Sequence, residues 1–262
     1  MSEVKSQLLT DEWALLAALG LKTYQQDEPL AIDSSKLLDD ALCLATLQKI
    51  QPEIGAPNLK ITASLVMKRV AFLTLAPVLY SMSRFDKGLN ATLENSVFEY
   101  PLKNRLWLSK MPLKSTSISI CRSDRDAWRE SVLTAVFSGN LSLLVEQFYA
   151  LTKVPKCILW ENIAVRVFSI YERRILMNIS EEIRAQAQSD YEFLLDTKTS
   201  ALFGLDENPL TRFHRKTLKT ALSDEAVRVR RTCCYYYQAT QPSEYCSNCP
   251  LPLKKMKKLK KM

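Results

Sequence analysis

Four of the seven cysteines in this 262-residue chain lie close together near its C-terminal end, and they constrain its fold more than any other feature. Cys233 and Cys234 are adjacent, and Cys246 and Cys249 follow as a C-x-x-C pair. In a reducing compartment, so dense a set of thiols indicates a metal or redox centre before a disulfide scaffold. We therefore interpret this segment as a metal-binding or redox element.

The rest of the sequence is typical of a soluble protein of the cytoplasm. The N-terminal "MSEVKSQLLTDEW" lacks the basic start and apolar core of a signal peptide. The longest apolar run, "AFLTLAPVLY" at 71–80, is shorter than a membrane-spanning helix. We expect a cytoplasmic location, in which thiols stay reduced. The scattered Cys43, Cys121 and Cys157 stand in apolar surroundings and are interpreted as small buried hydrophobic residues.

The scarcity of histidine and glycine excludes several classes of enzyme. The single histidine, His214, disfavours a histidine-rich zinc or non-haem iron site. No serine or cysteine stands in a recognisable nucleophile motif. The five glycines lie too far apart to form the phosphate-binding turn of a Rossmann fold or a P-loop. If the chain performs redox chemistry, we expect its electrons to come from a partner.

The spacing of apolar residues predicts an α+β fold that is predominantly helical. Helical patterns cover the N-terminal third, in "DEWALLAALGL", "SKLLDDALCLATLQKI" and the stretch 59–85. Short runs of β-branched and aromatic residues between about 94 and 121 predict two or three strands of a small antiparallel sheet. Helices are expected to resume after Ser123, with Gly139 as a stop, and a short helix is expected after Ser223. The helices would pack around the small sheet.

We divide the chain into three parts. Residues 1–222 form the mainly helical domain with the small sheet, 223–253 the cysteine-rich segment, and 254–262 a basic tail. The tail, "KKMKKLKKM", holds six lysines and so most of the net charge of +8. A terminal run of this kind is usually a solvated tail, although it could dock an acidic electron donor or an anionic membrane. We expect no nucleic acid partner.

The spacing of the four cysteines bears on the kind of centre. A mononuclear zinc site usually takes its ligands from two C-x-x-C turns, and Cys246-Ser-Asn-Cys249 has that form. Cys233 and Cys234 do not, because adjacent side chains point in diverging directions. Diverging thiolates suit a [2Fe–2S] cluster better, because four cysteines must then bind two irons lying side by side. Arginines and tyrosines flank the pair, and they could offset the charge of such a cluster and shield it.

The whole motif resembles the C-terminal segment of the FhuF-type ferric-siderophore reductases. That family binds a [2Fe–2S] cluster through a C-C-x10-C-x2-C arrangement. Here "RRT" precedes the adjacent pair and "PL" follows the last cysteine, and the spacer 235–245 has eleven residues, one more than the family pattern. Carried over by position, the resemblance implies that the cluster ligands are Cys233, Cys234, Cys246 and Cys249.

Two upstream segments also resemble elements of this family. "LWENIAVRVF" contains Trp160 and Asn162, and "ENPLTRF" contains Asn208 and Pro209. Their order along the chain agrees with the family. Taken alone, they are equally typical of a core tryptophan and an ordinary Asn-Pro turn.

The resemblance implies an oxidoreductase that reduces ferric siderophores by one-electron transfer from the cluster. Hard oxygen donors hold Fe(II) far less well than Fe(III), so reduction alone would release the iron in the cytoplasm for assimilation. The implied partners are the ferric siderophore and an external electron donor, and a peripheral contact with the inner membrane face or a siderophore importer is compatible with this role. The helical part would form a groove for the chelate, with basic residues such as Arg166 or Arg173 facing anionic chelates.

Two alternatives remain open from the residues alone. The first is a zinc-binding structural or interaction module with a basic tail, which would be colourless and free of acid-labile sulfide. The second is a ferredoxin-like electron carrier with an acceptor other than a ferric chelate. A thiol–disulfide enzyme is less favoured, because Cys246 and Cys249 lack the βαβ context of thioredoxin.

Overall fold

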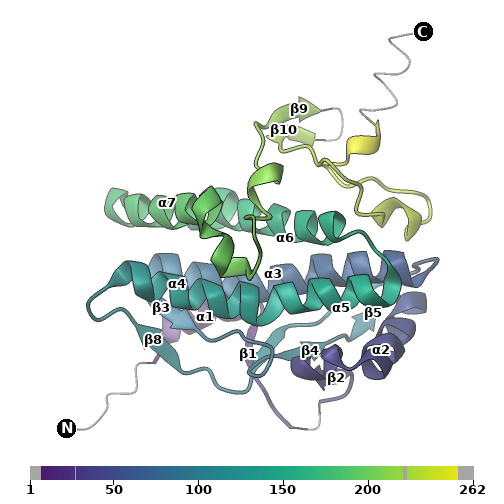
Figure 1. Ribbon diagram of the computed structural model, residues 1–262, viewed down its shortest axis with the longest axis horizontal. Coiled ribbons are helices and arrows are strands. Elements are labelled where there is room, and N and C mark those ends of the chain that lie inside the picture. The colour runs from purple at the N-terminus through teal and green to yellow at the C-terminus, as the bar shows by residue number, and fades with distance from the viewer. Residues whose placement is uncertain (1–6, 27, 221–222, 253–262) are drawn as a thin grey trace.

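The computed structural model describes residues 7–26, 28–220 and 223–252 (Figure 1). Its α-helices are α1 (Thr10–Ala18), α2 (Asp40–Glu53), α3 (Leu59–Phe85), α4 (Arg125–Val136), α5 (Ser142–Thr152), α6 (Lys156–Ile170) and α7 (Glu181–Leu195). Shorter helical turns are η1 (Ser34–Leu38), η2 (Phe137–Leu141), η3 (Tyr171–Ile175), η4 (Thr197–Phe203), η5 (Thr211–Phe213) and η6 (Tyr236–Gln238). The basic tail 254–262, with its expected docking role, lies outside the described residues.

The strands are short and form separate pairs. They are β1 (Leu21–Thr23), β2 (Ala31–Asp33), β3 (Lys87–Leu89), β4 (Val97–Glu99), β5 (Leu102–Lys103), β6 (Leu106–Trp107), β7 (Met111–Leu113), β8 (Ile118–Ile120), β9 (Leu218–Thr220) and β10 (Ser223–Val227). Strand β4 pairs antiparallel with β2, β8 antiparallel with β3, β5 antiparallel with β6, and β7 parallel with β1. A single bridge between Ser96 and Leu113 links two of these pairs.

The fold class predicted from the sequence is confirmed, because helices dominate and small antiparallel pairs accompany them. The pairing itself differs in detail. Apart from the hairpin β5–β6, the strands between 94 and 121 pair with strands nearer the N-terminus and not with one another. Those partners have three residues each, which is too short for an alternating pattern to be visible.

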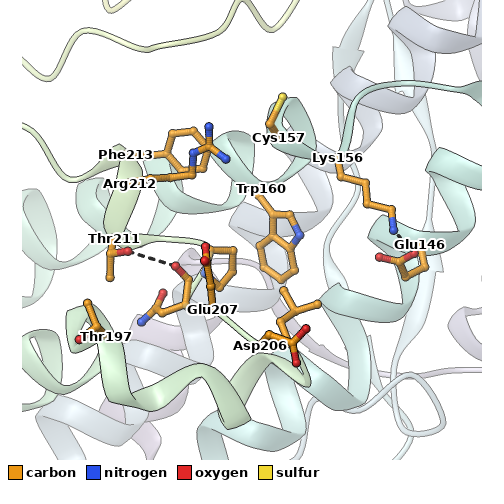
Figure 2. Close-up of a pocket in the computed structure, with 13 residues that line it drawn as sticks. Glu146, Lys156, Cys157, Trp160, Thr197, Asp206, Glu207, Thr211, Arg212 and Phe213 are labelled. Atoms are coloured by element: carbon orange, nitrogen blue, oxygen red, sulfur yellow. Dashed lines mark hydrogen bonds and ion pairs between the residues drawn. The ribbon is translucent and has the colours of Figure 1, made fainter.

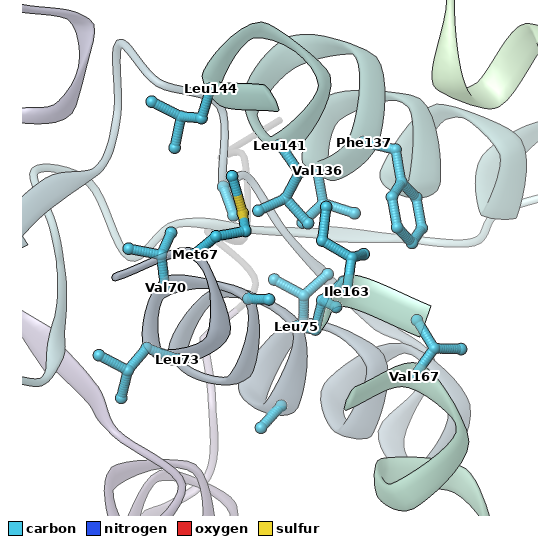
Figure 3. Packing of buried hydrophobic residues seen from close by; sticks show 14 of the residues in the cluster. Met67, Val70, Leu73, Leu75, Val136, Phe137, Leu141, Leu144, Ile163 and Val167 are labelled. Atoms are coloured by element: carbon cyan, nitrogen blue, oxygen red, sulfur yellow. The ribbon is translucent and has the colours of Figure 1, made fainter. Parts of the chain in front are cut away.

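Helix α3 forms the centre of the protein. It contacts α1, α2, α4, α5, α6 and α7. In Figure 1 the long helices run side by side, with strands β1, β2, β4 and β8 below them and β9 and β10 above. Figure 3 shows Met67 and Leu75 of α3 among Leu141 and Ile163 of neighbouring elements, and all four side chains are buried. The core therefore consists of this helix and the helices packed around it.

The length of α3 corrects one expectation. By length and composition this 27-residue helix could cross a membrane, whereas the sequence was expected to contain no run of that length. Pro77 lies inside the helix without ending it. Within its most apolar window, 83% of the residues are buried inside the protein. The apolar character of α3 is thus accounted for by its central position in the fold.

Two further segments differ from expectation. Ser223 begins strand β10, which pairs antiparallel with β9, and so the prediction of a short helix there is wrong. Pairing with a neighbouring strand has overridden the local helical pattern. Gly139 does not stop a helix, because it lies in the π-helical turn η2 that joins α4 to α5. The next residue, Asn140, is buried and donates to the Ala91 carbonyl at 2.7 Å.

Candidate metal centre

The part of the cysteine-rich segment that follows strand β10 lies against the N-terminal halves of α3 and α6, at the upper right of Figure 1. Cys234 and Cys249 are buried, whereas Cys233 and Cys246 are partly exposed. Of the other cysteines, Cys43 is buried as expected, and Cys121 and Cys157 are only partly buried. The segment thus places two cysteines inside the protein and two at its surface.

Two of the four sulfurs, those of Cys234 and Cys246, lie close together. The Sγ atoms of Cys234 and Cys246 lie 3.9 Å apart. The Sγ of Cys233 instead accepts a hydrogen bond from the N–H of Tyr235 at 3.3 Å, so the two adjacent cysteines face different partners. The N–H of Cys249 donates to the Cys246 carbonyl at 2.9 Å, which closes the C-x-x-C turn. No three Cys, His, Asp or Glu side chains of the described residues are grouped tightly enough to hold one metal ion.

Glu161 of α6 fixes the chain immediately before the adjacent cysteines. Its carboxylate accepts hydrogen bonds from the backbone N–H of Arg231 at 2.6 Å and of Thr232 at 2.8 Å, and from the Thr232 hydroxyl. The Nε of Arg230 lies 3.7 Å from the same carboxylate, and both side chains are at most 2% exposed. A buried carboxylate is tolerated when it is paired and hydrogen-bonded in this way. Glu161 therefore holds the entry to the cysteine pair against α6.

A second contact fixes the backbone at Cys234 itself. The Ser64 hydroxyl of α3 donates to the Cys234 carbonyl at 3.0 Å. Asn162 of α6 donates through Nδ2 to the Ser64 carbonyl at 2.8 Å and to its Oγ at 3.1 Å. Both side chains are buried. Asn162, one of the residues that resemble the family, thus acts on the cysteine loop through Ser64.

The environment favours a thiolate at one cysteine of the close pair. A hydrogen bond from Cys246 lowers the pKa of Cys234 to about 5, with help from the nearby Lys68 and Arg230 cations and despite burial. The same hydrogen bond, together with burial, raises the pKa of Cys246. Burial raises the pKa of Cys233 to about 11. Since the thiolate is the metal-binding form, the Cys234 thiol is the most readily deprotonated of these three.

The donors around the sulfurs fit an anionic iron–sulfur cluster. The Lys68 ammonium lies 4.0 Å from the Cys234 Sγ. Among the described residues, the buried Nη2 of Arg230 has no hydrogen-bond partner, and the charge of this side chain favours the thiolate forms of Cys233 and Cys234. A buried donor without an acceptor is costly, and the sulfurs of a cluster are acceptors. The set of four cysteines with these cations therefore fits a [2Fe–2S] cluster.

The flanking residues differ in their placement. Arg231, which was expected to share the role of Arg230, has an exposed side chain. Tyr235 and Tyr236 are partly buried against the hydrophobic core, and Tyr237 stacks on Tyr245 with 5.4 Å between ring centroids. Whether these rings shield the centre from solvent stays a prediction.

Two cavities adjoin the cysteine segment. The first has a volume of about 300 Å³ and lies between α3, α6, the β5–β6 hairpin and η6; we call it the basic hollow, and it is lined by Lys68, Arg69, Arg105, Trp107, Arg166 and Tyr236 among others. The second, of about 260 Å³, shares Lys68 and Arg166 with it and also contains Cys246, Glu172, Arg173, Arg228 and Arg230. Arg166 thus lines both cavities and Arg173 only the second.

The other residues that resemble the family meet at a third cavity, shown in Figure 2. It has a volume of about 700 Å³ and is lined by Trp160, Asn208 and Pro209 among others. The Nδ2 of Asn208 donates to the carbonyls of Leu194 and Asp196, each at 2.9 Å, so this side chain holds its loop in place. Although this cavity is larger than the two beside the cysteine segment, none of the four clustered cysteines lines it.

Three residues that build the centre are not among those predicted from the sequence, namely Glu161, Ser64 and Lys68. For Glu161 a signal was present, because a single acid stands inside the apolar pattern "CILWENIAV". For the other two there was no local signal, since their roles arise from the packing of α3 against α6 and the cysteine segment.

Comparison with known protein families gives two matches. The family described as "Ferric iron reductase FhuF-like transporter" matches residues 64–220, which is more than half of the chain. The family described as "FhuF 2Fe-2S C-terminal domain" matches residues 230–251, which include all four clustered cysteines. None of the curated proteins matches the chain.

Proposed function

The chain belongs to the FhuF-like ferric iron reductase family and carries that family's [2Fe–2S] C-terminal domain, and from this premise we propose that it reduces siderophore-bound Fe(III) to Fe(II). The observation that carries the proposal is the match over residues 230–251, because this segment contains every clustered cysteine and docks beside two cavities large enough to admit part of a chelate. We further propose that the reaction takes place in the cytoplasm and supplies iron for assimilation.

The proposed cluster ligands are Cys233, Cys234, Cys246 and Cys249. When bound there, a [2Fe–2S] cluster supplies electrons one at a time. Glu161 positions the first pair by accepting the backbone N–H groups that precede it. The C-x-x-C turn positions the second pair.

The chain's own cations and anchors have distinct tasks in this scheme. Arg230 and Lys68 neutralise negative charge at the thiolates, and a hydrogen bond from the free Nη2 of Arg230 would favour the more negative state of the centre. Ser64 and Asn162 hold the Cys234 backbone so that the thiolates keep their position during turnover. No side chain needs to exchange a proton with the chelate.

The substrate chemistry requires only one electron. A siderophore holds Fe(III) with hard oxygen donors, and the softer, less charged Fe(II) is bound far less tightly by the same donors. No covalent bond of the organic ligand has to break. We propose that the electron comes from an external donor, because the five glycines lie too far apart to form a nucleotide-binding turn. We further propose that this donor is an acidic protein that meets the basic tail, residues 254–262.

Single-turnover reduction tests this function. The protein is purified without oxygen, reduced with one electron equivalent of dithionite, and mixed with ferric siderophores in the presence of ferrozine. We expect about one Fe(II) released per reduced chain, because a [2Fe–2S] centre carries one electron. Cys233→Ser should abolish this release, whereas Cys121→Ser, at a cysteine outside the segment, should leave it unchanged.

The same measurement separates a reductase from an electron carrier. A protein that passes its electron to other carriers while releasing no Fe(II) from any ferric chelate would show that the carrier function is correct and the reductase function wrong. Full activity of Cys233→Ser would contradict the proposed ligand set.

A further inference from the structure

The basic hollow carries positive charge without any acid in its wall. Four of its lining residues are cations, Lys68, Arg69, Arg105 and Arg166, and none is Asp or Glu. A concave site lined by one sign of charge focuses the electrostatic field and attracts ligands of the opposite sign. This makes the hollow a candidate site for an anion.

Among the described residues the four cations also lack carboxylate partners, although Lys68 lies against the Cys234 sulfur. In residues 7–26, 28–220 and 223–252, none of them forms an ion pair with a carboxylate. Arg69 donates to the Ser109 carbonyl at 2.5 Å, and Arg166 donates to the Lys68 carbonyl at 3.2 Å, which are neutral acceptors. Burial and the neighbouring Arg230 and Arg69 lower the pKa of Arg166, as expected where cations crowd together. No carboxylate of the described residues thus balances the charge of the three arginines, whereas Lys68 faces the Cys234 thiolate.

The second cavity differs in this respect. Its Glu172 forms an ion pair with Arg228 and lies 3.9 Å from His214 Nε2. Its Arg173 lies 3.8 Å from Glu225. The protein's own acids therefore balance much of its charge. An anionic ligand would meet less attraction there than in the basic hollow.

Arg105 occupies an unusual backbone position at the mouth of the hollow. It lies in the tight turn between β5 and β6 with a φ of +64°, after Asn104 with a φ of +51°. Glycine is strongly preferred at this second position, because a side chain there is strained. Strained positions of this kind cluster at functional sites. The turn directs the Arg105 guanidinium toward Gly55, at the edge of the same hollow.

The hollow also adjoins the cysteine segment directly. Lys68 lines the hollow and lies 4.0 Å from the Cys234 Sγ. Tyr236, two residues after Cys234, forms another part of its wall, with the Lys68 ammonium 4.9 Å from its ring centroid. A ligand in the hollow would therefore be separated from the cysteines by single side chains. This is the placement that an electron acceptor requires.

We propose that the basic hollow is the chelate site and that it selects ferric chelates of net negative charge. The inference rests on the proposed function and names its substrate class. Three singly charged hydroxamates neutralise Fe³⁺, whereas catecholates and polycarboxylates leave a net anionic complex. Carboxylate or catecholate oxygens would accept hydrogen bonds from Arg69, Arg105 and Arg166. Trp107 and Tyr236 supply apolar faces for the organic part of the ligand.

Binding of redox-inert analogues tests the site without turnover. Gallium(III) forms complexes of the same charge as iron(III) that cannot be reduced here, so Ga–EDTA is an anionic probe and Ga-tris(acetohydroxamate) a neutral one. By calorimetry on the cluster-loaded protein, we expect tighter binding of the anionic complex. Arg69→Gln and Arg105→Gln should each weaken it by about fivefold, with no effect on the neutral complex, because each removes one charged hydrogen bond.

Matched variants control for folding and for location. Arg105→Lys and Arg69→Lys retain the charge but not the guanidinium fork, so they should bind the anionic complex more tightly than the corresponding Gln variants and less tightly than wild type. Arg105→Gly removes the cation and places glycine, which readily adopts a positive φ, in the turn, so the fold should be retained. Arg173 was expected from the sequence to face the chelate, but it lines only the second cavity, so Arg173→Gln should leave binding unchanged if the basic hollow is the site. Unaltered visible spectra of the variants confirm that the centre is intact.

The outcomes separate this inference from the proposed function. Equal affinity of wild type for both gallium complexes, or weakening by Arg173→Gln alone, overturns the assignment of the hollow. If the protein binds the anionic complex selectively but reduces neither iron chelate, the reductase function fails and the anion site stands. If it reduces both iron chelates and the two Gln variants change neither binding nor KM, the function stands and the hollow is not the chelate site.

Discussion

Individual side chains decide how this protein handles charge, and Arg230 and Glu161 show it most clearly. The two form an ion pair in which both side chains are almost completely buried. Arg230 stands three residues before Cys233 in the chain, and Glu161 belongs to α6. Burial of opposite charges is costly unless further hydrogen bonds satisfy them, and Glu161 accepts three from the segment it holds. At the surface, by contrast, pairs such as Lys156 with Glu146 are exposed and contribute little.

His214 provides a pH-dependent term at the residue scale. The ring is 40% exposed, and partial burial and the nearby Arg228 lower its pKa in the folded protein, although Glu172 acts in the opposite direction. As the pH falls below about 7, the unfolded chain binds the proton first, and folding is therefore disfavoured. We predict that the free energy of unfolding, measured in urea, falls more between pH 7.5 and 5.5 for wild type than for His214→Gln. Equal losses in the two proteins would contradict the assignment.

At the scale of elements, α6 is the support on which the cysteine segment rests. Its Glu161 accepts a hydrogen bond from the chain before Cys233. Its Asn162 acts on the chain after Cys233 through Ser64 of α3, which donates to the Cys234 carbonyl. The helix is predicted well from its apolar spacing, but its functional face consists of the two polar residues that interrupt that spacing. The centre thus depends on the packing of α3 against α6 as much as on the cysteines.

Glu161→Gln tests this dependence. A glutamine leaves the buried Arg230 without its counter-ion and places an amide N–H₂ against the backbone donors of the segment. Breaking a buried pair in this way costs about 3 kcal/mol, so we expect that loss in the free energy of unfolding together with reduced cluster content after purification. Glu146→Gln, which disrupts only an exposed pair, serves as the control and should cost less than about 1 kcal/mol. A Glu161→Gln protein with wild-type stability and cluster content would refute the role of α6.

Over the whole molecule, the parts that could be predicted are those encoded locally. The long helices follow from apolar residues at helical spacing, and the four cysteines from a motif that needs no structural context. The pairing of three-residue strands could not be predicted, because such strands have no visible period and find their partners through the fold. The prediction of a helix at β10 is wrong for the same reason, because its partner β9 decides its conformation.

The functional site divides along the same line. Cys233, Cys234, Cys246 and Cys249 are visible in the sequence, whereas the cations of the basic hollow come from α3, α6 and the β5–β6 hairpin, which are distant in the chain. Within the part of the chain that the structure describes, none of these cations pairs with a carboxylate, and this is a property of the folded protein only. The chemistry of the centre can therefore be inferred from a motif, but the site for its substrate requires the structure.

The central claim, that the four cysteines together hold a two-iron centre, is tested most directly by iron and acid-labile sulfide analysis of protein purified without oxygen. We predict about two irons and two sulfides per chain in wild type and in Cys121→Ser, and near-complete loss of sulfide in each of the four single Cys→Ser variants. A protein that contains zinc or a single iron without sulfide, or a Cys234→Ser variant with undiminished iron and sulfide, would contradict it.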